Sequence, residues 1–215
     1  MRRRDFSQVV VLSASAWGLS VPLAHAQAKA PVAGKDYIKL SRPAPVDTPA
    51  GKVEVLEFFG YWCPHCAKFE PAFDAWAKKA PAHIVVRRIP VAFRDNQSPL
   101  QRLYFALEAM GKVDEVHHKV FTALHGDKVA LNTQDDIVNW VVKQGVDKTK
   151  FLEQYNSFSM SGKVKRASQL AEAYQLDGVP AMGVAGQYFT SGSLAGTMER
   201  VLAVVEHLAE VSRKA

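Results

Sequence analysis

Cysteine is scarce in this sequence: the 215 residues include only Cys63 and Cys66, three positions apart. A disulfide between them closes almost no loop, so it would add little stability by constraining the unfolded chain. A structural zinc site is disfavoured because no second ligand pair accompanies them. Ala67 follows Cys66, so the haem-attachment pattern C-x-x-C-H is missing too. The remaining interpretation is a working redox pair.

Dense charge clusters are also missing. The formal net charge is +6, but residues 2–5 (RRRD) contribute +2 of it, which leaves +4 for the rest of the chain. This mildly basic composition without a Lys/Arg patch argues against nucleic acid as a partner. With 48% hydrophobic residues, the chain can bury a core of its own and form one domain or a domain with an insertion.

No apolar run is long enough to indicate a typical membrane-spanning helix. Residues 1–26 resemble a signal peptide: three arginines, a moderately apolar segment over 9–23, and Ala24-His25-Ala26 as a cleavage site. We expect cleavage after Ala26 and a periplasmic location, where disulfides form and persist. An uncleaved anchor remains an alternative, and the arginines leave open whether export follows the general or the twin-arginine route.

Residues 27–50 contain much alanine, lysine and proline. This composition predicts a flexible N-terminal leader with one short edge strand around Tyr37 to Leu40. No residue type in this leader indicates catalysis.

The segment over residues 53–71 (VEVLEFFGYWCPHCAKFEP) begins as a strand and continues as a helix. Its first part is apolar on both alternating faces, which predicts a central strand covered on both sides. Gly60 ends this run, and Pro64 suits the first turn of a helix, where its missing N–H needs no partner. Cys63 is therefore predicted at the helix N-cap, with Cys66 one turn inside.

This position predicts the chemistry of the pair. Free N–H groups and the helix dipole favour the Cys63 thiolate, and His65 adds a positive charge when protonated. We expect Cys63 to be the exposed, attacking sulfur and Cys66 the resolving one. A stabilised thiolate favours the dithiol form, so the disulfide becomes an oxidant, by roughly 30 mV for each further unit of pKa depression.

Three motifs carry a family resemblance: CPHC after LEFF, FEP after Cys66, and GVPAM at residues 178–182. Together they resemble the DsbA family, periplasmic thiol:disulfide oxidoreductases of the thioredoxin superfamily. The resemblance runs from about Tyr37 to near the C-terminus. It implies an α/β, thioredoxin-like fold with an inserted helical domain, and a reaction that needs no bound cofactor.

The patterns in the rest of the chain fit a thioredoxin-like fold with an inserted helical domain. Strands are predicted at 84–91, 181–186 and 187–191, and a final helix at 197–212. Between the strand regions, five segments show helical periodicity: 100–110, 113–125, 133–144, 147–158 and 161–174. We therefore predict a thioredoxin-like domain from residues 51–97 and 176–215, with a helical domain inserted at 98–175. Asp147 is a plausible N-cap in the insertion.

Several polar residues call for a choice between a structural and a functional role. His117 and His118 are adjacent on a predicted helix and point about 100° apart, so solvated or packed histidines are favoured over a metal site. Arg87 and Arg88 indicate a solvated edge strand, although the resemblance places a basic residue such as Arg88 close to buried acids.

Glu57 is the only charged residue in the apolar run 55–59. A buried carboxylate is costly unless it is paired or protonated, so this position invites a functional explanation. The resemblance implies that Glu57 assists proton transfer at Cys66, while a structural ion pair remains an alternative. Glu70, one turn beyond Cys66, is a weaker candidate, and a solvated helix residue is at least as good an interpretation.

The segment Gly178-Val179-Pro180-Ala181 precedes a predicted strand. Residue preferences alone favour a trans proline there. The resemblance instead implies a cis Pro180 facing the cysteines, with the Val179 backbone free to pair with an extended substrate. Next to Cys63, Tyr61 and Trp62 are expected as exposed aromatics at the mouth of the site, with core packing as the alternative.

These expectations combine into a protein dithiol oxidase that donates the Cys63–Cys66 disulfide to reduced, unfolded exported proteins. The resemblance implies reoxidation by a DsbB-like membrane partner linked to quinone, and a monomer. One alternative is an exported reductase or isomerase on the same fold, although the leader is too short for the dimerisation domain that isomerases of this superfamily usually carry. Another is a peptide-binding chaperone with incidental cysteines.

Overall fold

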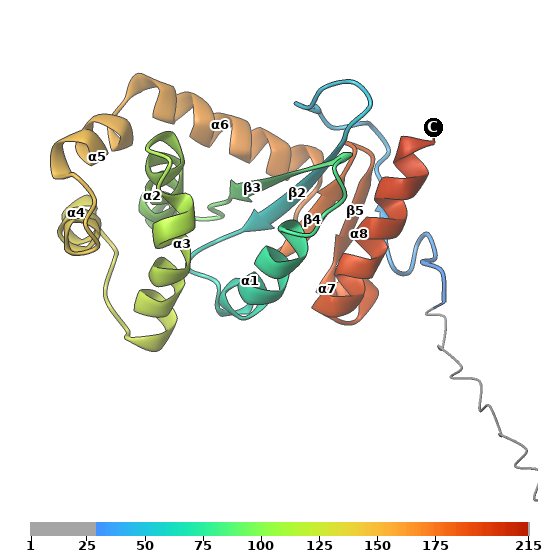
Figure 1. Cartoon of the computed structure of the whole chain (residues 1–215), viewed down its shortest axis with the longest axis horizontal. Helices are drawn as coiled ribbons and strands as arrows, with labels where there is room; N and C mark the ends of the chain where they lie inside the picture. The colour runs from blue at the N-terminus through green and yellow to red at the C-terminus, as the bar shows by residue number, and fades with distance from the viewer. Residues whose placement is uncertain (1–28, 215) are drawn as a thin grey trace, which may run out of the picture.

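The computed structural model describes residues 29–214, which form a five-stranded sheet flanked by helices (Figure 1). The strand order is β1-β5-β4-β2-β3. The strands are β1 (Ile38–Lys39), β2 (Val53–Phe59), β3 (Ile84–Pro90), β4 (Ala181–Val184) and β5 (Tyr188–Ser191). β2 pairs parallel to β3 and antiparallel to β4, and all seven of its residues are buried, which confirms a strand covered on both faces.

Both faces of the sheet carry helices. On one face, α1 (Pro64–Ala77) and α8 (Met198–Arg213) pack Phe73 and Val205 against the β2 and β4 side chains Val55 and Met182. A short helix, α7 (Gly192–Ala195), precedes α8. On the other face, Phe58 of β2 contacts the Tyr174 ring, with ring centroids 5.1 Å apart. The active-site segment therefore lies between two apolar cores.

Between β3 and β4 the chain leaves the sheet and forms the five predicted helices. They are α2 (Ser98–Ala109), α3 (Val113–Phe121), α4 (Gln134–Lys143), α5 (Lys148–Tyr155) and α6 (Phe158–Ala173), with a 3-10 turn η1 (Asp95–Gln97) before α2 and a π-helical turn η2 (Thr122–Gly126) after α3. Asp147 caps α5 by accepting the Lys150 N–H at 2.8 Å, as predicted. These helices lie to one side of the sheet, and α6 returns along it towards β4 (Figure 1). The limits predicted for the inserted domain, 98–175, stay a prediction.

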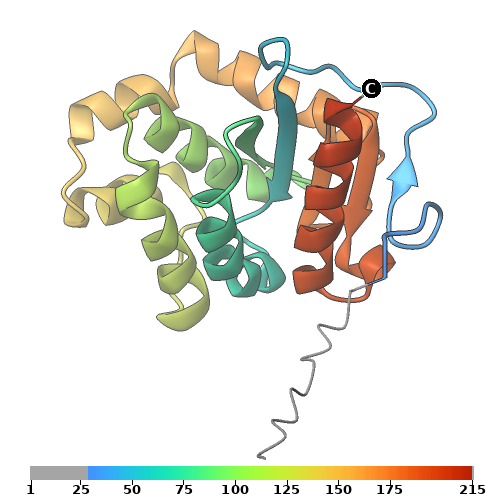
Figure 2. The same ribbon diagram turned by 45° about the vertical axis from the view of Figure 1, so that its right-hand side comes forward.

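The N-terminal segment differs from the prediction of a flexible leader. Its edge strand is present and pairs with β5, but the flanking residues also pack on the body of the protein (Figure 2). The Leu40 and Ala44 N–H groups donate to the carbonyls of Gln187 and Gly186 in the β4–β5 turn. Asp36 is buried and pairs with Arg200 of α8 at 3.4 Å. These partners lie about 150 residues further along the chain, so local composition could not reveal them. The predicted signal peptide falls outside the described residues.

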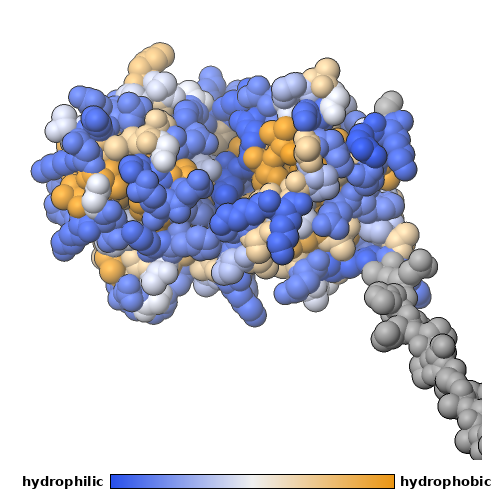
Figure 3. Space-filling model, viewed as in Figure 1, coloured by the Kyte–Doolittle hydropathy of each residue, from blue (hydrophilic) through white to orange (hydrophobic). Residues whose placement is uncertain are grey.

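The molecular surface is largely hydrophilic on the face shown in Figure 3, with apolar side chains in separate small patches. None of the helices within residues 29–214 combines the length and the apolar character needed to cross a bilayer. Phe93, one of the exposed large apolar side chains, packs edge-on against Trp62, with ring centroids 5.8 Å apart. This pair adjoins the candidate active site.

Candidate active site

The dithiol lies where α1 begins. Cys63 is the N-cap residue in an extended conformation, Pro64 occupies the first helical position, and both cysteines are free thiols, as the pattern predicts for the reduced pair. The exposed attacking sulfur, however, was a wrong expectation. Cys63 is only 4% exposed because the loop before β4 covers it, and its thiol donates to the Val179 carbonyl at 3.3 Å. Pro64 and His65 are exposed above it.

The two thiols differ in acidity. The pKa of Cys63 is lowered to about 6, chiefly by a hydrogen bond from the Cys66 thiol. The N–H groups of Cys66 and His65 and the charge of His65 act in the same direction, while burial opposes them. Burial raises the pKa of Cys66 well above its usual range. At neutral pH the reduced pair therefore holds one thiolate, on Cys63, and one thiol, on Cys66.

We expect this acidity to appear as a pH profile. Alkylation of Cys63 in the reduced protein should rise with a midpoint near pH 6, because its pKa is about 6. A depressed folded-state pKa stabilises the folded reduced form above the unfolded pKa, and this stability is lost as the pH falls through about 6. Urea unfolding of the reduced protein against a Cys63→Ser variant measures that loss. A midpoint near that of an ordinary thiol would contradict the assignment.

The loop before β4 faces the dithiol. The Val179–Pro180 peptide bond is cis, as the resemblance implied, and Pro180 is buried. The Val179 carbonyl was expected to be free for a substrate. It accepts a hydrogen bond from Cys63 when that sulfur is protonated, and ionisation of Cys63 removes this bond. A groove of about 290 Å³ runs beside this loop between His65, Val179 and Met198. The groove is lined by Pro180 on one side and by His65, two residues after Cys63, on the other.

The two aromatic residues before Cys63 have different environments. Trp62 is partly buried, and its indole N–H donates to the Val91 carbonyl at 3.2 Å. Tyr61 is fully buried, which corrects the expectation of an exposed residue: its hydroxyl bonds to His117 Nδ1 at 2.7 Å. A third residue, His125, donates from Nε2 to the Tyr61 carbonyl at 2.8 Å. The sequence prediction did not include His125 in the site. The one indication in the sequence was that His125 follows His117 by eight positions in the same predicted helix.

Glu57 lies in a buried charge network behind Cys66. The Arg88 guanidinium bridges two carboxylates, Glu57 at 3.3 Å and Glu70 at 2.6 Å. Burial, followed by the charge of Glu70, raises the pKa of Glu57 well above its usual range, and Arg88 opposes this rise. The raised pKa favours the protonated form of Glu57, so this side chain keeps a proton to a higher pH than an ordinary carboxyl group does. Glu70 is buried, which corrects its interpretation as a solvated helix residue. Arg88 faces these acids, as the resemblance implied, although β3 is the edge strand that was predicted.

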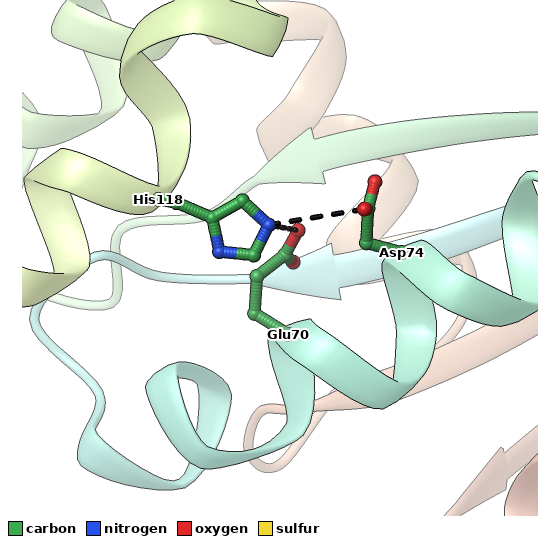
Figure 4. Close-up of side chains that lie close together, drawn as sticks. All are labelled: Glu70, Asp74 and His118. Carbon is green, nitrogen blue, oxygen red and sulfur yellow. Dashed lines mark ion pairs between the residues drawn. The ribbon is translucent and has the colours of Figure 1, made fainter.

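A histidine of α3 extends this network towards the surface. His118 lies 3.7 Å from Glu70 and 3.9 Å from Asp74, and the three side chains point towards one another between α1 and α3 (Figure 4). Such a set could in principle hold a cation. The nearest carboxylate oxygens already contact cations, however: Arg88 at Glu70 and Lys78 at Asp74, 2.7 Å away. We therefore interpret the cluster as a charge network.

The fold and the dithiol define the class of protein. A sheet flanked by α1 and α8, a Cys-x-x-Cys pair at the start of α1 and a cis proline facing it make this chain a thioredoxin-like thiol:disulfide oxidoreductase. Residues 88–200 match the DSBA-like thioredoxin domain. The chain therefore belongs to the family of the DSBA-like thioredoxin domain.

Individual relatives agree with this assignment. The chain is 43% identical to "Thiol:disulfide interchange protein DsbA" of Bordetella parapertussis over 216 aligned residues, with 100% of both chains covered. A Pseudomonas aeruginosa protein of the same name is 43% identical, with 88% of this chain and 90% of the relative covered. The crystal structure of Pseudomonas aeruginosa DsbA superposes with a TM-score of 0.82 at 41% identity, covering 85% of this chain and 95% of the other.

Proposed function

We propose that this protein is a periplasmic dithiol oxidase that donates the Cys63–Cys66 disulfide to reduced, newly exported proteins. The observation that carries the proposal is the asymmetry of the two thiols. The Cys63 pKa of about 6 stabilises the reduced pair relative to the disulfide, so the disulfide is readily passed on. The shared name of the relatives, "Thiol:disulfide interchange protein DsbA", supports the same reaction.

The reaction balances in two exchanges. A substrate thiolate attacks Cys63 Sγ, the Cys63–Cys66 bond breaks, and a mixed disulfide forms while Cys66 leaves as a thiolate. Cys66 then takes up a proton, since its pKa is raised, and Glu57 behind it is the proposed proton donor. A second substrate thiolate attacks the substrate sulfur of the mixed disulfide and releases Cys63 as a thiolate. Two electrons have passed from substrate to enzyme. The two substrate thiols lose two protons when they ionise and Cys66 takes up one through Glu57, so one proton is released overall.

The other predicted residues take supporting roles in this proposal. Pro64 starts α1 and leaves the next N–H groups free to face Cys63, and His65 adds positive charge beside it. An extended substrate lies against Val179 and Pro180, and Trp62, next to Cys63 in the chain, contributes a partly buried aromatic contact. The reaction needs no metal or cofactor.

The Cys63–Cys66 dithiol must be reoxidised after each reaction, and the protein must reach the compartment of its substrates. The dithiol has to return its two electrons, and we propose a DsbB-like membrane partner that passes them to quinone. Residues 1–26 would direct export and be removed after Ala26, leaving a monomer whose substrates are unfolded exported proteins. We retain the division into a thioredoxin-like domain (51–97 and 176–215) and an inserted helical domain (98–175).

The equilibrium of the dithiol with glutathione tests the direction of the reaction. We expect the disulfide to be reduced even in mildly oxidising glutathione buffer, because the Cys63 thiolate stabilises the dithiol. Thiol alkylation after acid quenching gives the reduced fraction, and tryptophan fluorescence, compared with a Trp62→Phe variant, gives an independent reading. A disulfide that persists until the buffer is strongly reducing would favour an exported reductase instead.

A further inference from the structure

Helix α3 and the turn η2 that continues it form hydrogen bonds to both the side chain and the backbone of Tyr61. His117 of α3 bonds to the Tyr61 hydroxyl at 2.7 Å, and His125 of η2 bonds to its backbone carbonyl at 2.8 Å. A carbonyl only accepts hydrogen bonds, so His125 Nε2 carries the proton. The Tyr61 ring also lies 5.0 Å from the ring of Phe121, which stands between the two histidines in the helix. Hydrogen bonds and ring packing thus connect Tyr61 to a helix about 60 residues further along the chain.

The π-helical turn brings these groups into line. In a continuous α-helix, positions eight residues apart diverge by roughly 80° around the axis. The π-helical turn at Thr122–Gly126 is wider, with hydrogen bonds from i to i+5, and reduces this divergence. His117, Phe121 and His125 consequently form one column of rings, with centroids 5.2 Å and 6.2 Å apart. Turns of this kind are often associated with functional sites.

The bond from His125 falls inside the turn that presents the dithiol. The Cys63 N–H donates to the Gly60 carbonyl at 3.0 Å, which closes a turn over residues 60–63. The Tyr61 carbonyl belongs to the central peptide of this turn, and the Trp62 indole anchors the next side chain to Val91. Fixing the orientation of that peptide restricts the backbone angles with which Cys63 enters α1. Those angles decide whether its sulfur meets the free N–H groups of His65 and Cys66.

We propose that His125 is a positioning residue of the active site: by donating to the Tyr61 carbonyl, it holds the turn over residues 60–63 so that Cys63 faces the N-terminus of α1. The helical insertion then contributes to the reactivity of the dithiol, in addition to enclosing it. This inference rests on the proposed role of Cys63 as the attacking sulfur. It concerns His125 itself, which touches no reacting atom.

Three substitutions at one position separate the hydrogen bond from packing. His125→Gln places an amide nitrogen near the position of Nε2 and keeps the donor, whereas His125→Asn is too short to reach Tyr61. His125→Phe keeps a ring beside Phe121 but has no donor. His207→Phe, in α8, is the matched control, because His207 makes no hydrogen bond to the turn in the described part of the chain.

The readout is the pH dependence of Cys63 alkylation in the reduced protein, with urea unfolding of each variant as a check on folding. At pH 6 we expect His125→Phe and His125→Asn to slow alkylation by about two- to fivefold through a raised Cys63 pKa, with His125→Gln and His207→Phe close to wild type. Wild-type titration in folded His125→Phe or His125→Asn would overturn the proposal, as would an equal slowing in His125→Gln. Thiol titration needs no oxidase activity, so this result stands apart from that of the glutathione equilibrium.

Discussion

Replacing Cys63 by serine is expected to reduce the oxidation of a reduced, unfolded substrate by at least about 1,000-fold. The hydroxyl cannot form the disulfide, and Cys66 is buried at 1% exposure behind it, so no other sulfur is placed to meet a substrate. The measurement is the rate at which the pre-oxidised protein restores activity to a reduced, disulfide-dependent enzyme. Far-ultraviolet circular dichroism shows whether the variant is folded.

Cys66→Ser provides the matched comparison. It keeps the Cys63 thiolate but removes its disulfide partner, so we expect oxidation of a reduced substrate to be lost here too. With a substrate that already carries a disulfide, the Cys63 thiolate attacks one sulfur, the other leaves as a thiolate, and the mixed disulfide accumulates because no Cys66 sulfur displaces Cys63. Non-reducing electrophoresis detects these adducts. Substantial oxidation of the substrate by the Cys63→Ser variant would contradict the assignment of Cys63 as the attacking sulfur. A double cysteine variant that still fully prevents aggregation would favour a peptide-binding chaperone with incidental cysteines.

The second large effect is expected from Arg88→Met. This change leaves Glu57 and Glu70 facing each other without their shared cation, and both are almost completely buried. Breaking a buried ion pair in this way costs about 3 to 5 kcal/mol of unfolding free energy. The loss should shrink as the pH falls, because protonation of an uncompensated carboxylate removes its buried charge. Urea unfolding of the oxidised protein at several pH values measures both effects.

Two further variants distinguish charge compensation from the loss of a long side chain. Arg166→Met removes an exposed arginine whose one ion pair within residues 29–214 is with exposed Asp47, and it should change stability by less than about 0.5 kcal/mol. Adding Glu70→Gln to Arg88→Met removes one of the two buried charges and should recover part of the lost stability. If Arg88→Met proves as stable as wild type at neutral pH, the carboxylates are not held ionised by this guanidinium.

Local rules predicted the parts of the site that depend on neighbours in sequence. Cys63 is the N-cap because Pro64 suits the first helical position. This placement brings the Cys66 thiol, and then the free N–H groups of Cys66 and His65, to the Cys63 sulfur and lowers its pKa. Glu57 could be recognised as a buried acid because it interrupts an apolar strand. The cis geometry at Pro180 was accessible only through the family resemblance, since residue preferences alone favour trans.

The wrong expectations have a common physical origin, which is that burial of a polar group depends on partners far away in sequence. Glu70 has the appearance of a solvated helix residue until β3 brings Arg88, 18 positions further on, to within 2.6 Å. Tyr61 is buried because His117, 56 positions away, satisfies its hydroxyl. In each case the partner that offsets the cost of burying the polar group comes from another element. The sequence of one segment therefore cannot show that such burial is possible.

The antiparallel pairing of β2 with β4 carries a consequence for how this protein is made. Val55 pairs with Val184, so neighbouring strands of the sheet are separated by about 130 residues of chain. The segment with the two cysteines is synthesised more than 100 residues before the strand that follows Pro180. Contacts between such distant segments form slowly, and incomplete chains leave β2 with an unpaired edge. This thiol:disulfide oxidoreductase thus cannot assemble its own active site until the strand that follows Pro180 has been made.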